Sequence, residues 1–233
     1  MHISGGPAKF REALRWKEVD FYLSRGGGNL SRVTIDDGPA RVPESSYVRI
    51  GISGTPYIRA SELTALAASG AVVTVDAAAE AFAGVAELTD LVSEMLEVPV
   101  SVAAKLSWCR SAAVHPQKQE TDTLVVQPCG EVEWWAHRPV PVCPPMLDPE
   151  TAEMPPGGPQ WHPTALKQGD CLYVPRGGWY CCRSVNQASI TLVLSFSAPT
   201  AIDILGRIVD RLRRFPNMHL EQELWIGQGA FFF

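Results

Sequence analysis

Two stretches in the C-terminal half of the chain alternate short apolar runs with turn residues. In the first stretch, the apolar run Leu124–Val126, rich in β-branched residues, stops at Pro128–Gly130 and is followed by a second run over Glu131–Trp135. Such a pattern is typical of two strands joined by a tight turn that requires glycine. It predicts a β-hairpin over Asp122–Trp135, with Gly130 in its turn.

The second stretch, Gly169–Tyr180, has the same character. A turn at Gly169-Asp170 precedes an apolar strand over Cys171–Val174, and Pro175–Gly178 separates this strand from another that begins at Trp179. Together with the first stretch, this succession of short strands predicts an antiparallel barrel or jelly roll.

The N-terminal part mixes a helix with short strands. An amphipathic helix is expected within residues 1–30, followed by a glycine-rich connector. Short antiparallel strands are then predicted over Arg32–Ile35 and Tyr47–Ile52. The apolar side of the helix comprises Phe10, Leu14, Val19 and Leu23.

Helical spacing appears in the next part of the chain. Ser61–Ser69 is predicted as a helix capped by Ser61 and ended by Gly70, and Ala71–Val75 as a buried strand. The longest predicted helix, Asp76–Leu96, carries an apolar stripe that we expect to pack on the barrel. The stripe comprises Phe82, Val85, Leu88, Leu91, Val92 and Leu96.

Composition and charge narrow the choice of function. With 233 residues, 46% of them hydrophobic, the chain is long enough for one compact domain with a modest extension. Its net charge of −5 argues against a nucleic-acid partner, because phosphate binding depends on clustered Lys and Arg. The sequence has neither an apolar run of about 20 residues nor an apolar signal core. We therefore expect a cytoplasmic protein without a membrane partner.

The two strand-rich stretches also resemble a known family, the cupin-type JmjC oxygenases, and in particular its ribosomal-protein hydroxylase branch. The resemblance covers most of residues 40–198. It implies a mainly β fold of the α+β class, a double-stranded β-helix (jelly-roll or cupin) barrel with flanking helices and a C-terminal helix. The matching residues are Asp122, Gln127, Gly130, Trp134, Gly169, Asp170, Leu172, Tyr173, Pro175 and Gly177.

From the pattern and the resemblance we expect three parts. These are an N-terminal helix and linker at 1–30, a JmjC-like barrel at 31–198 and a C-terminal helical extension at 199–233. The barrel includes a helical insert at 61–96 and a proline-rich loop at 138–163. Its proline density excludes a central strand or helix, and the family places substrate-covering insertions there.

The resemblance implies that the residues that carry the family's chemistry are replaced. It places the iron-binding His and Asp at Gln117 and Gln119, the distal His at Tyr180, and the basic anchor of 2-oxoglutarate at Val132. Neutral amides and a phenol, whose reference pKa is about 10, are poor ligands for iron(II). A dicarboxylate would also enter a pocket without a fixed counter-charge. We therefore expect no cofactor, with binding of both Fe(II) and 2-oxoglutarate lost.

Candidate site residues follow from these positions. The candidate catalytic residues are Tyr180, Gln117 and His115, although a water-satisfied His at a strand entrance remains an alternative for His115. Pro116 also disfavours a regular strand there. The candidate substrate-binding residues are Gln119, Val132, Trp134, Trp179 and Gln127. Core packing is the alternative role for the tryptophans, and only one of Trp134 and Trp135 can point inward.

The cysteines and the C-terminal segment leave further alternatives open. A zinc site drawn from Cys171, Cys181 and Cys182 is conceivable, but neighbours on a strand point to opposite faces, so buried thiols are favoured and no metal ligand is assigned. After a last barrel strand over Ile190–Phe196, a helix is expected over Pro199–Arg214. A homodimer through this helix is one expected role for it.

Three functions fit the pattern. The first is a metal-independent enzyme acting on a small amino-acid-derived or natural-product substrate, and the second is a non-catalytic pseudo-oxygenase that binds a peptide or partner. The third is an atypical Fe(II)/2-oxoglutarate hydroxylase that uses His115 and Asp122 as ligands. We favour the first, because the Trp and Gln lining and the proline-rich cover indicate a small enclosed pocket.

Overall fold

The computed structural model divides the chain into two units, Met1–Ser197 and Ala198–Phe233. In the second unit only Leu205 and Val209, both helical, are described, so the predicted C-terminal helix otherwise lies outside the described residues, as does most of the proline-rich loop. No helix in the described parts is long and apolar enough to cross a membrane. The structure describes residues 1–24, 30–38, 40–111, 116–137, 161–185, 187–197, 205 and 209.

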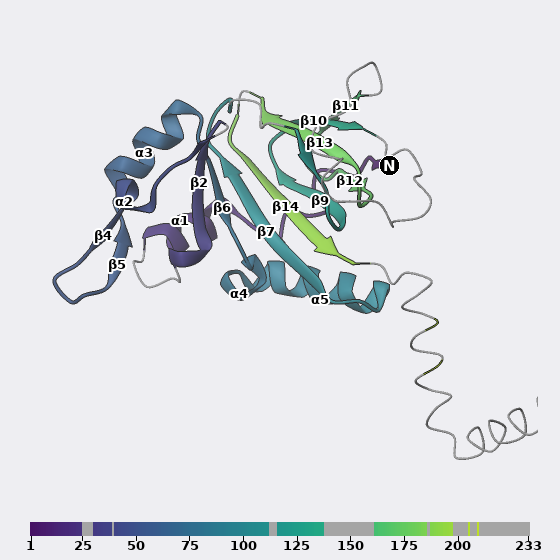
Figure 1. The fold of residues 1–233 in the computed structure, drawn as a ribbon, viewed down its shortest axis with the longest axis horizontal. Coiled ribbons are helices and arrows are strands. Elements are labelled where there is room, and N and C mark those ends of the chain that lie inside the picture. Colours follow the sequence, from purple (N-terminus) through teal and green to yellow (C-terminus); the bar gives the residue numbers. More distant parts are fainter. Residues whose placement is uncertain are drawn as a thin grey trace, which may run out of the picture. The chain divides into compact units, whose positions relative to one another are not determined.

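Two facing antiparallel sheets form the jelly roll of the first unit (Figure 1), which confirms the predicted fold class. The larger, eight-stranded sheet has the order β1 (His2–Ile3), β12 (Cys171–Val174), β9 (Asp122–Cys129), β14 (Ser189–Phe196), β7 (Val100–Ser107), β6 (Val72–Val75), β2 (Val33–Asp37) and β3 (Ala40–Arg41). The four-stranded sheet has the order β11 (Trp161–Leu166), β10 (Val132–His137), β13 (Trp179–Ser184) and β8 (Gln117–Lys118).

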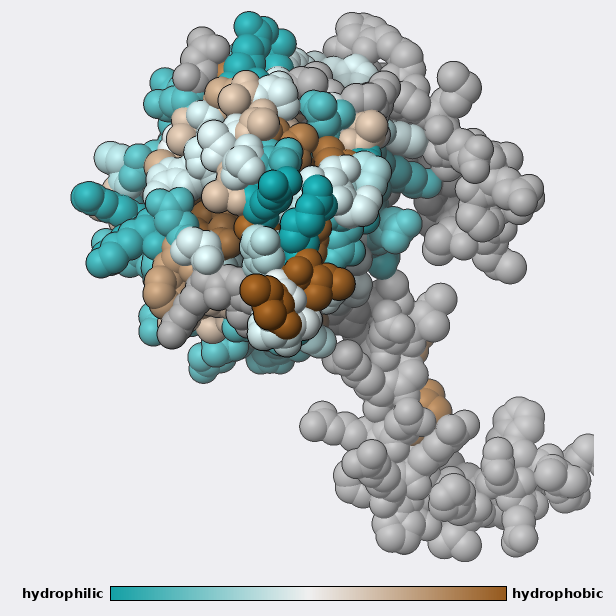
Figure 2. Space-filling view, turned by 90° about the vertical axis from the view of Figure 1, so that its left-hand side faces the viewer, coloured by the Kyte–Doolittle hydropathy of each residue, from teal (hydrophilic) through white to brown (hydrophobic). Residues whose placement is uncertain are grey.

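Helices and a separate hairpin complete this unit. The helices are α1 (Trp16–Ser24), η1 (Leu30–Arg32), α2 (Glu44–Tyr47), α3 (Ala60–Ser69), α4 (Ala78–Ala81) and α5 (Ala83–Leu96). Strands β4 (Val48–Ile50) and β5 (Pro56–Ile58) form a two-stranded sheet that projects away from the jelly roll in Figure 1. Ile50 and Ile52 of this hairpin are exposed, and Figure 2, viewed from that side, shows an apolar group among hydrophilic surroundings.

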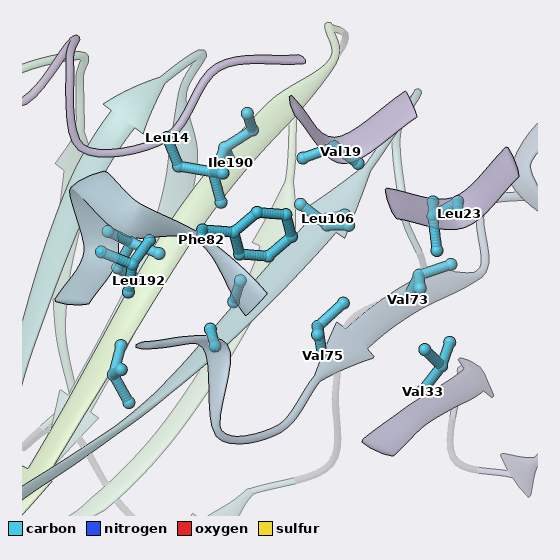
Figure 3. Packing of buried hydrophobic residues seen from close by; sticks show 14 of the residues in the cluster. Leu14, Val19, Leu23, Val33, Val73, Val75, Phe82, Leu106, Ile190 and Leu192 are labelled. Carbon is cyan, nitrogen blue, oxygen red and sulfur yellow. The ribbon is translucent and has the colours of Figure 1, made fainter. Parts of the chain in front are cut away.

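Alternate residues of strand β7 in the large sheet face two different environments. On β7, Val102, Ala104 and Leu106 are buried in the main hydrophobic core. Side chains of α1 and of the turn between α4 and α5 converge on this same face of the sheet (Figure 3). The residues between them on β7, such as Lys105, therefore face the small sheet, because neighbours on a strand point to opposite sides. The sheet thus packs on helices with one face and encloses the barrel interior with the other.

The predicted hairpin over Asp122–Trp135 is wrong, although its turn glycine is confirmed. β9 pairs with β12 and β14 in the large sheet, whereas β10 pairs with β11 and β13 in the small one. The turn at Gly130 therefore carries the chain from one sheet to the other. Gly130 has φ of +75°, and a Cβ there would lie 2.4 Å from the carbonyl oxygen of Ala188. Local turn chemistry was readable from the sequence, but strand pairing depends on distant strands.

Several helix boundaries also differ from the expectation. The predicted helix Asp76–Leu96 is broken at Phe82, whose extended backbone (φ −133°) ends α4 and precedes α5. Residues 7–13 form turns rather than helix, so the N-terminal helix begins only at Trp16. The residue before α3 is Arg59, not Ser61, and it makes no side-chain cap, whereas Gly70 ends the helix in the left-handed conformation as expected.

Part of the predicted helical stripe needs correction as well. Leu91 and Leu96 are exposed, because α5 contacts the sheet through a narrower face that includes Val85. Trp108, just after β7, packs its ring against Trp16 with centroids 5.2 Å apart and so adds to the main core.

Replacement of Gly130 by Ala is expected to lower the free energy of unfolding by at least about 1–2 kcal/mol. A side chain at positive φ costs that much on its own, and the contact with the Ala188 carbonyl adds to it. Urea denaturation measures the change. Gly6→Ala is the matched control, because a Cβ at Gly6 meets nothing within 4 Å. An equal effect of the two substitutions would contradict this account of the turn.

Candidate functional site

A cavity of about 330 Å³ is lined by strands of both sheets. The large sheet contributes Thr74 of β6, Lys105 of β7, and Ser189 and Thr191 of β14, while the small sheet contributes Gln117, Val132, Trp134, Cys182 and Ser184. Asp36, Arg41 and Arg183 also line it. The cavity is therefore a pocket between the two sheets with both polar and apolar groups in its lining.

Lys105 lies at the centre of a polar row on the large sheet. Cross-strand pairing places it beside Thr74 of β6 on one side and beside Thr191 of β14 on the other. Thr191 is held in turn by Gln127, whose side-chain oxygen accepts a hydrogen bond from the Thr191 hydroxyl at 2.9 Å. The Lys105 ammonium thus lies between the hydroxyl groups of Thr74 and Thr191, and all three side chains face the small sheet.

Tyr180 reaches this row from the opposite sheet. It pairs across β13 and β8 with Gln117, and its hydroxyl donates a hydrogen bond to the Gln117 side-chain oxygen at 2.8 Å. The Tyr180 ring stacks on the indole of Trp134, with centroids 5.3 Å apart and an interplanar angle of 28°. The Lys105 ammonium lies 5.9 Å from the Tyr180 ring centroid and interacts electrostatically with the phenol. Lys105, Tyr180 and Gln117 are thus neighbours, and a hydrogen bond joins the last two.

Electrostatics fix the protonation of these residues. Burial raises the pKa of the Tyr180 phenol above its ordinary value, although the nearby Lys105 ammonium lowers it in part. Burial alone would lower the pKa of Lys105, but its interactions with Tyr180, Cys182 and the Asp36 carboxylate outweigh burial, and the pKa is raised. Burial likewise raises the pKa of the Cys182 thiol. At neutral pH the site therefore holds a charged ammonium, a neutral phenol and a neutral thiol.

These groups do not fit the iron site that the resemblance would place here. A neutral phenol whose proton is donated to an amide oxygen is a weak ligand, and an ammonium beside it repels a divalent cation. Among the residues that the structure describes, no group of three or more His, Cys, Asp or Glu could hold a metal. The zinc site considered for Cys171, Cys181 and Cys182 is not supported either, because Cys171 and Cys182 are buried in separate apolar clusters. His115 lies outside the described residues.

The candidate residues take different places. Gln117, Val132 and Trp134 line the cavity, and Tyr180 is buried beside it. Trp134 is the inward one of the tryptophan pair, since Trp135 is half-buried and carries the Arg183 guanidinium over its ring at 5.0 Å.

The remaining candidates do not line the cavity. The Gln119 side chain donates to the Thr123 hydroxyl. Trp179 is half-buried and pairs across the sheet with His137 and Lys118. Gln127 is completely buried and donates to the carbonyl oxygen of Cys129, so it supports Thr191 from behind. Roles in substrate binding remain predictions for these three.

Lys105 is the site residue that the sequence analysis missed. The expected pocket without a fixed counter-charge is wrong in this respect, because Lys105 lines the same cavity as Val132. The signal was present in the sequence: Lys105 is the single charged residue of the apolar strand Val100–Ser107. Alternation puts it opposite the buried Ala104 and Leu106.

Comparison with known proteins agrees with this architecture. A family model described as the JmjC domain matches residues 79–204. Two structures of YcfD from Escherichia coli, one of them described as a ribosomal oxygenase, align over 95% of this chain with 17% identity and TM-scores of 0.50 and 0.52. The chain covers 51% and 52% of those two chains, about half their length. No curated protein sequence matches.

Ultraviolet titration of tyrosine tests the electrostatics of the site. Because the folded pKa of Tyr180 exceeds the unfolded value of about 10, its stabilising contribution is complete below that pH and is lost as the pH rises through the folded pKa. We expect Tyr180→Phe to remove one phenol from the part of the titration above pH ~10. The free energy of unfolding of this variant should also fall less steeply with pH in that range. Loss of a phenol that ionises at lower pH would contradict the assigned protonation.

Proposed function

Because the chain belongs to the JmjC domain family, we propose that its barrel interior acts as a small-molecule site that works without iron and without 2-oxoglutarate. The observation that supports this proposal is the hydrogen bond from Tyr180 to Gln117 beside the Lys105 ammonium. Gln117 and Tyr180 stand where the resemblance places two iron-binding histidines. A positive charge is thus provided by a side chain in the part of the barrel where the family uses a metal.

In this proposal the protein is a metal-independent enzyme for a small amino-acid-derived or natural-product substrate. Gln117 orients the Tyr180 hydroxyl, and the proposal assigns to this hydroxyl the donation of a proton to a substrate in the adjacent cavity. The Lys105 ammonium stabilises negative charge that develops on the phenol oxygen or on the substrate. Trp134, stacked on Tyr180, keeps the ring in place.

Partner binding without catalysis is the second candidate function. It is favoured by the projecting β4–β5 hairpin, whose exposed Ile50 and Ile52 would suit a protein contact. The third candidate, an atypical hydroxylase, gains no comparable support. The Asp122 carboxylate that it requires already accepts hydrogen bonds from the Tyr173 hydroxyl at 2.6 Å and from the Arg176 backbone at 3.3 Å.

With a net charge of −5, we propose a cytoplasmic protein that binds neither nucleic acid nor membrane. A homodimer through the segment Pro199–Arg214 stays a prediction, because nearly all of that segment lies outside the described residues.

Elemental analysis of the purified protein, before and after anaerobic incubation with iron(II) and 2-oxoglutarate, tests the proposal. We expect no stoichiometric metal in either sample and no retention of 2-oxoglutarate, because a protonated Lys105 and a neutral Tyr180 offer iron no anionic ligand. Exposed Asp and Glu residues provide only weak sites that a brief chelator wash removes. About one iron per chain that survives the wash would contradict the proposal and direct assays to hydroxylation.

A further inference from the structure

We infer that the cavity recognises a small organic acid through one carboxylate, which pairs with the ammonium of Lys105. This inference rests on the proposed metal-independent site and names the class of its ligand. Three features of the cavity support it: the charge of Lys105, the state of Trp134 and the arrangement of the surrounding hydroxyl groups.

Lys105 carries a charge that has no ion-pair partner among the described residues. The Asp36 carboxylate of the same cavity acts on it from beyond ion-pair distance, and its neighbour Tyr180 is neutral. A half-buried ammonium without a paired anion is costly. The other cations of the lining differ, because Arg41 pairs with Asp36 at 3.7 Å and Arg183 with Glu133 at 2.6 Å. A ligand anion would therefore find its free counter-charge at Lys105.

Trp134, which lines the same cavity, carries an unused hydrogen-bond donor. Its indole lines the cavity and is only 2% exposed. Within the described parts of the chain, its Nε1 is a buried nitrogen without any hydrogen-bond partner. Leaving such a group unpaired costs about 1–3 kcal/mol. An acceptor oxygen of a bound ligand would remove this cost.

Hydroxyl groups surround the same space. Thr74 and Thr191 flank Lys105 in the strand register. Ser184 and Ser189 link the two sheets through their hydroxyl oxygens, which lie 3.2 Å apart. The Thr191 proton is already donated to Gln127, so its oxygen is left as an acceptor. The lining can therefore bind the oxygens of an acid and a second polar group on the same molecule.

Charge and size select a carboxylate over a larger or more highly charged anion. One free ammonium balances a single negative charge, whereas a phosphate dianion would need a second free cation. The volume of about 330 Å³ lies at the lower end of ligand pockets, which span about 300–1,000 Å³. Val132 and the Trp134 ring provide apolar contact for a short carbon skeleton. The ligand class is thus an acid of about the size of an amino acid.

Calorimetric and thermal-shift titrations with acetate, propionate and butyrate test this inference, with acetamide, propionamide and butyramide as neutral counterparts. Acetate is included because it is the smallest of the three acids. It should fit the cavity whatever carbon skeleton the natural ligand has. We expect the acids to bind and raise the melting temperature, and the amides to do neither. Lys105→Met should weaken acid binding at least about tenfold, as expected for loss of one partner of a desolvated charge pair.

Two further variants make the test specific. Lys167→Met is the matched control, because this lysine is exposed and does not line the cavity, and it should leave binding unchanged. Trp134→Phe keeps an aromatic ring against Tyr180 but removes the indole N–H. It should weaken binding severalfold, and it tests the site even if Lys105→Met fails to fold.

Three results would overturn the inference: no acid binds, the amides bind as well as the acids, or neither cavity variant weakens binding. Each leaves the metal-independent site standing if the protein also retains no iron. Retention of iron would instead remove the proposed function, and the two failures are therefore distinguishable.

Discussion

A half-buried ammonium inside a β-barrel is the constraint on which the rest of this site depends. Lys105 projects from the face of β7 that turns away from the main core, so its charge must be accommodated between the two sheets. The surroundings make this tolerable, because they include threonines on both neighbouring strands, a phenol from the opposite sheet and a cavity. Because the Tyr180 hydroxyl donates to Gln117, removal of Gln117 leaves this partly buried hydroxyl without its partner.

The jelly roll explains how these residues meet although they are distant in the sequence. Lys105, Gln117 and Tyr180 lie on β7, β8 and β13, which belong to two different sheets. The tight turn at Gly130 carries the chain between these sheets and places Trp134 opposite the polar row. The helices fill the other face of the large sheet with apolar side chains (Figure 3), which leaves the inner face free for polar residues.

Much of the fold was predictable from the sequence, and part of the site was not. Short strands, glycine turns and the rule that only one of Trp134 and Trp135 points inward follow from local periodicity and turn chemistry, whereas the choice of Trp134 came from the structure. The false hairpin at Gly130 shows the limit, because a turn glycine serves equally well within a sheet or between two sheets. Lys105 was missed for the same reason: alternation assigns it to one face of its strand, but only the second sheet makes that face the interior of a barrel.

Competition between the ammonium and a metal tests the central claim most directly. Iron(II) binding can be measured by anaerobic titration for the wild type, for a Gln117→His/Gln119→Asp/Tyr180→His variant, and for the same variant with Lys105→Met. If Lys105 takes the place of the metal charge, the wild type will not bind, the triple variant will bind weakly, and removal of the ammonium will strengthen binding at least about tenfold. Tight binding by the wild type, or no effect of Lys105→Met, would contradict it.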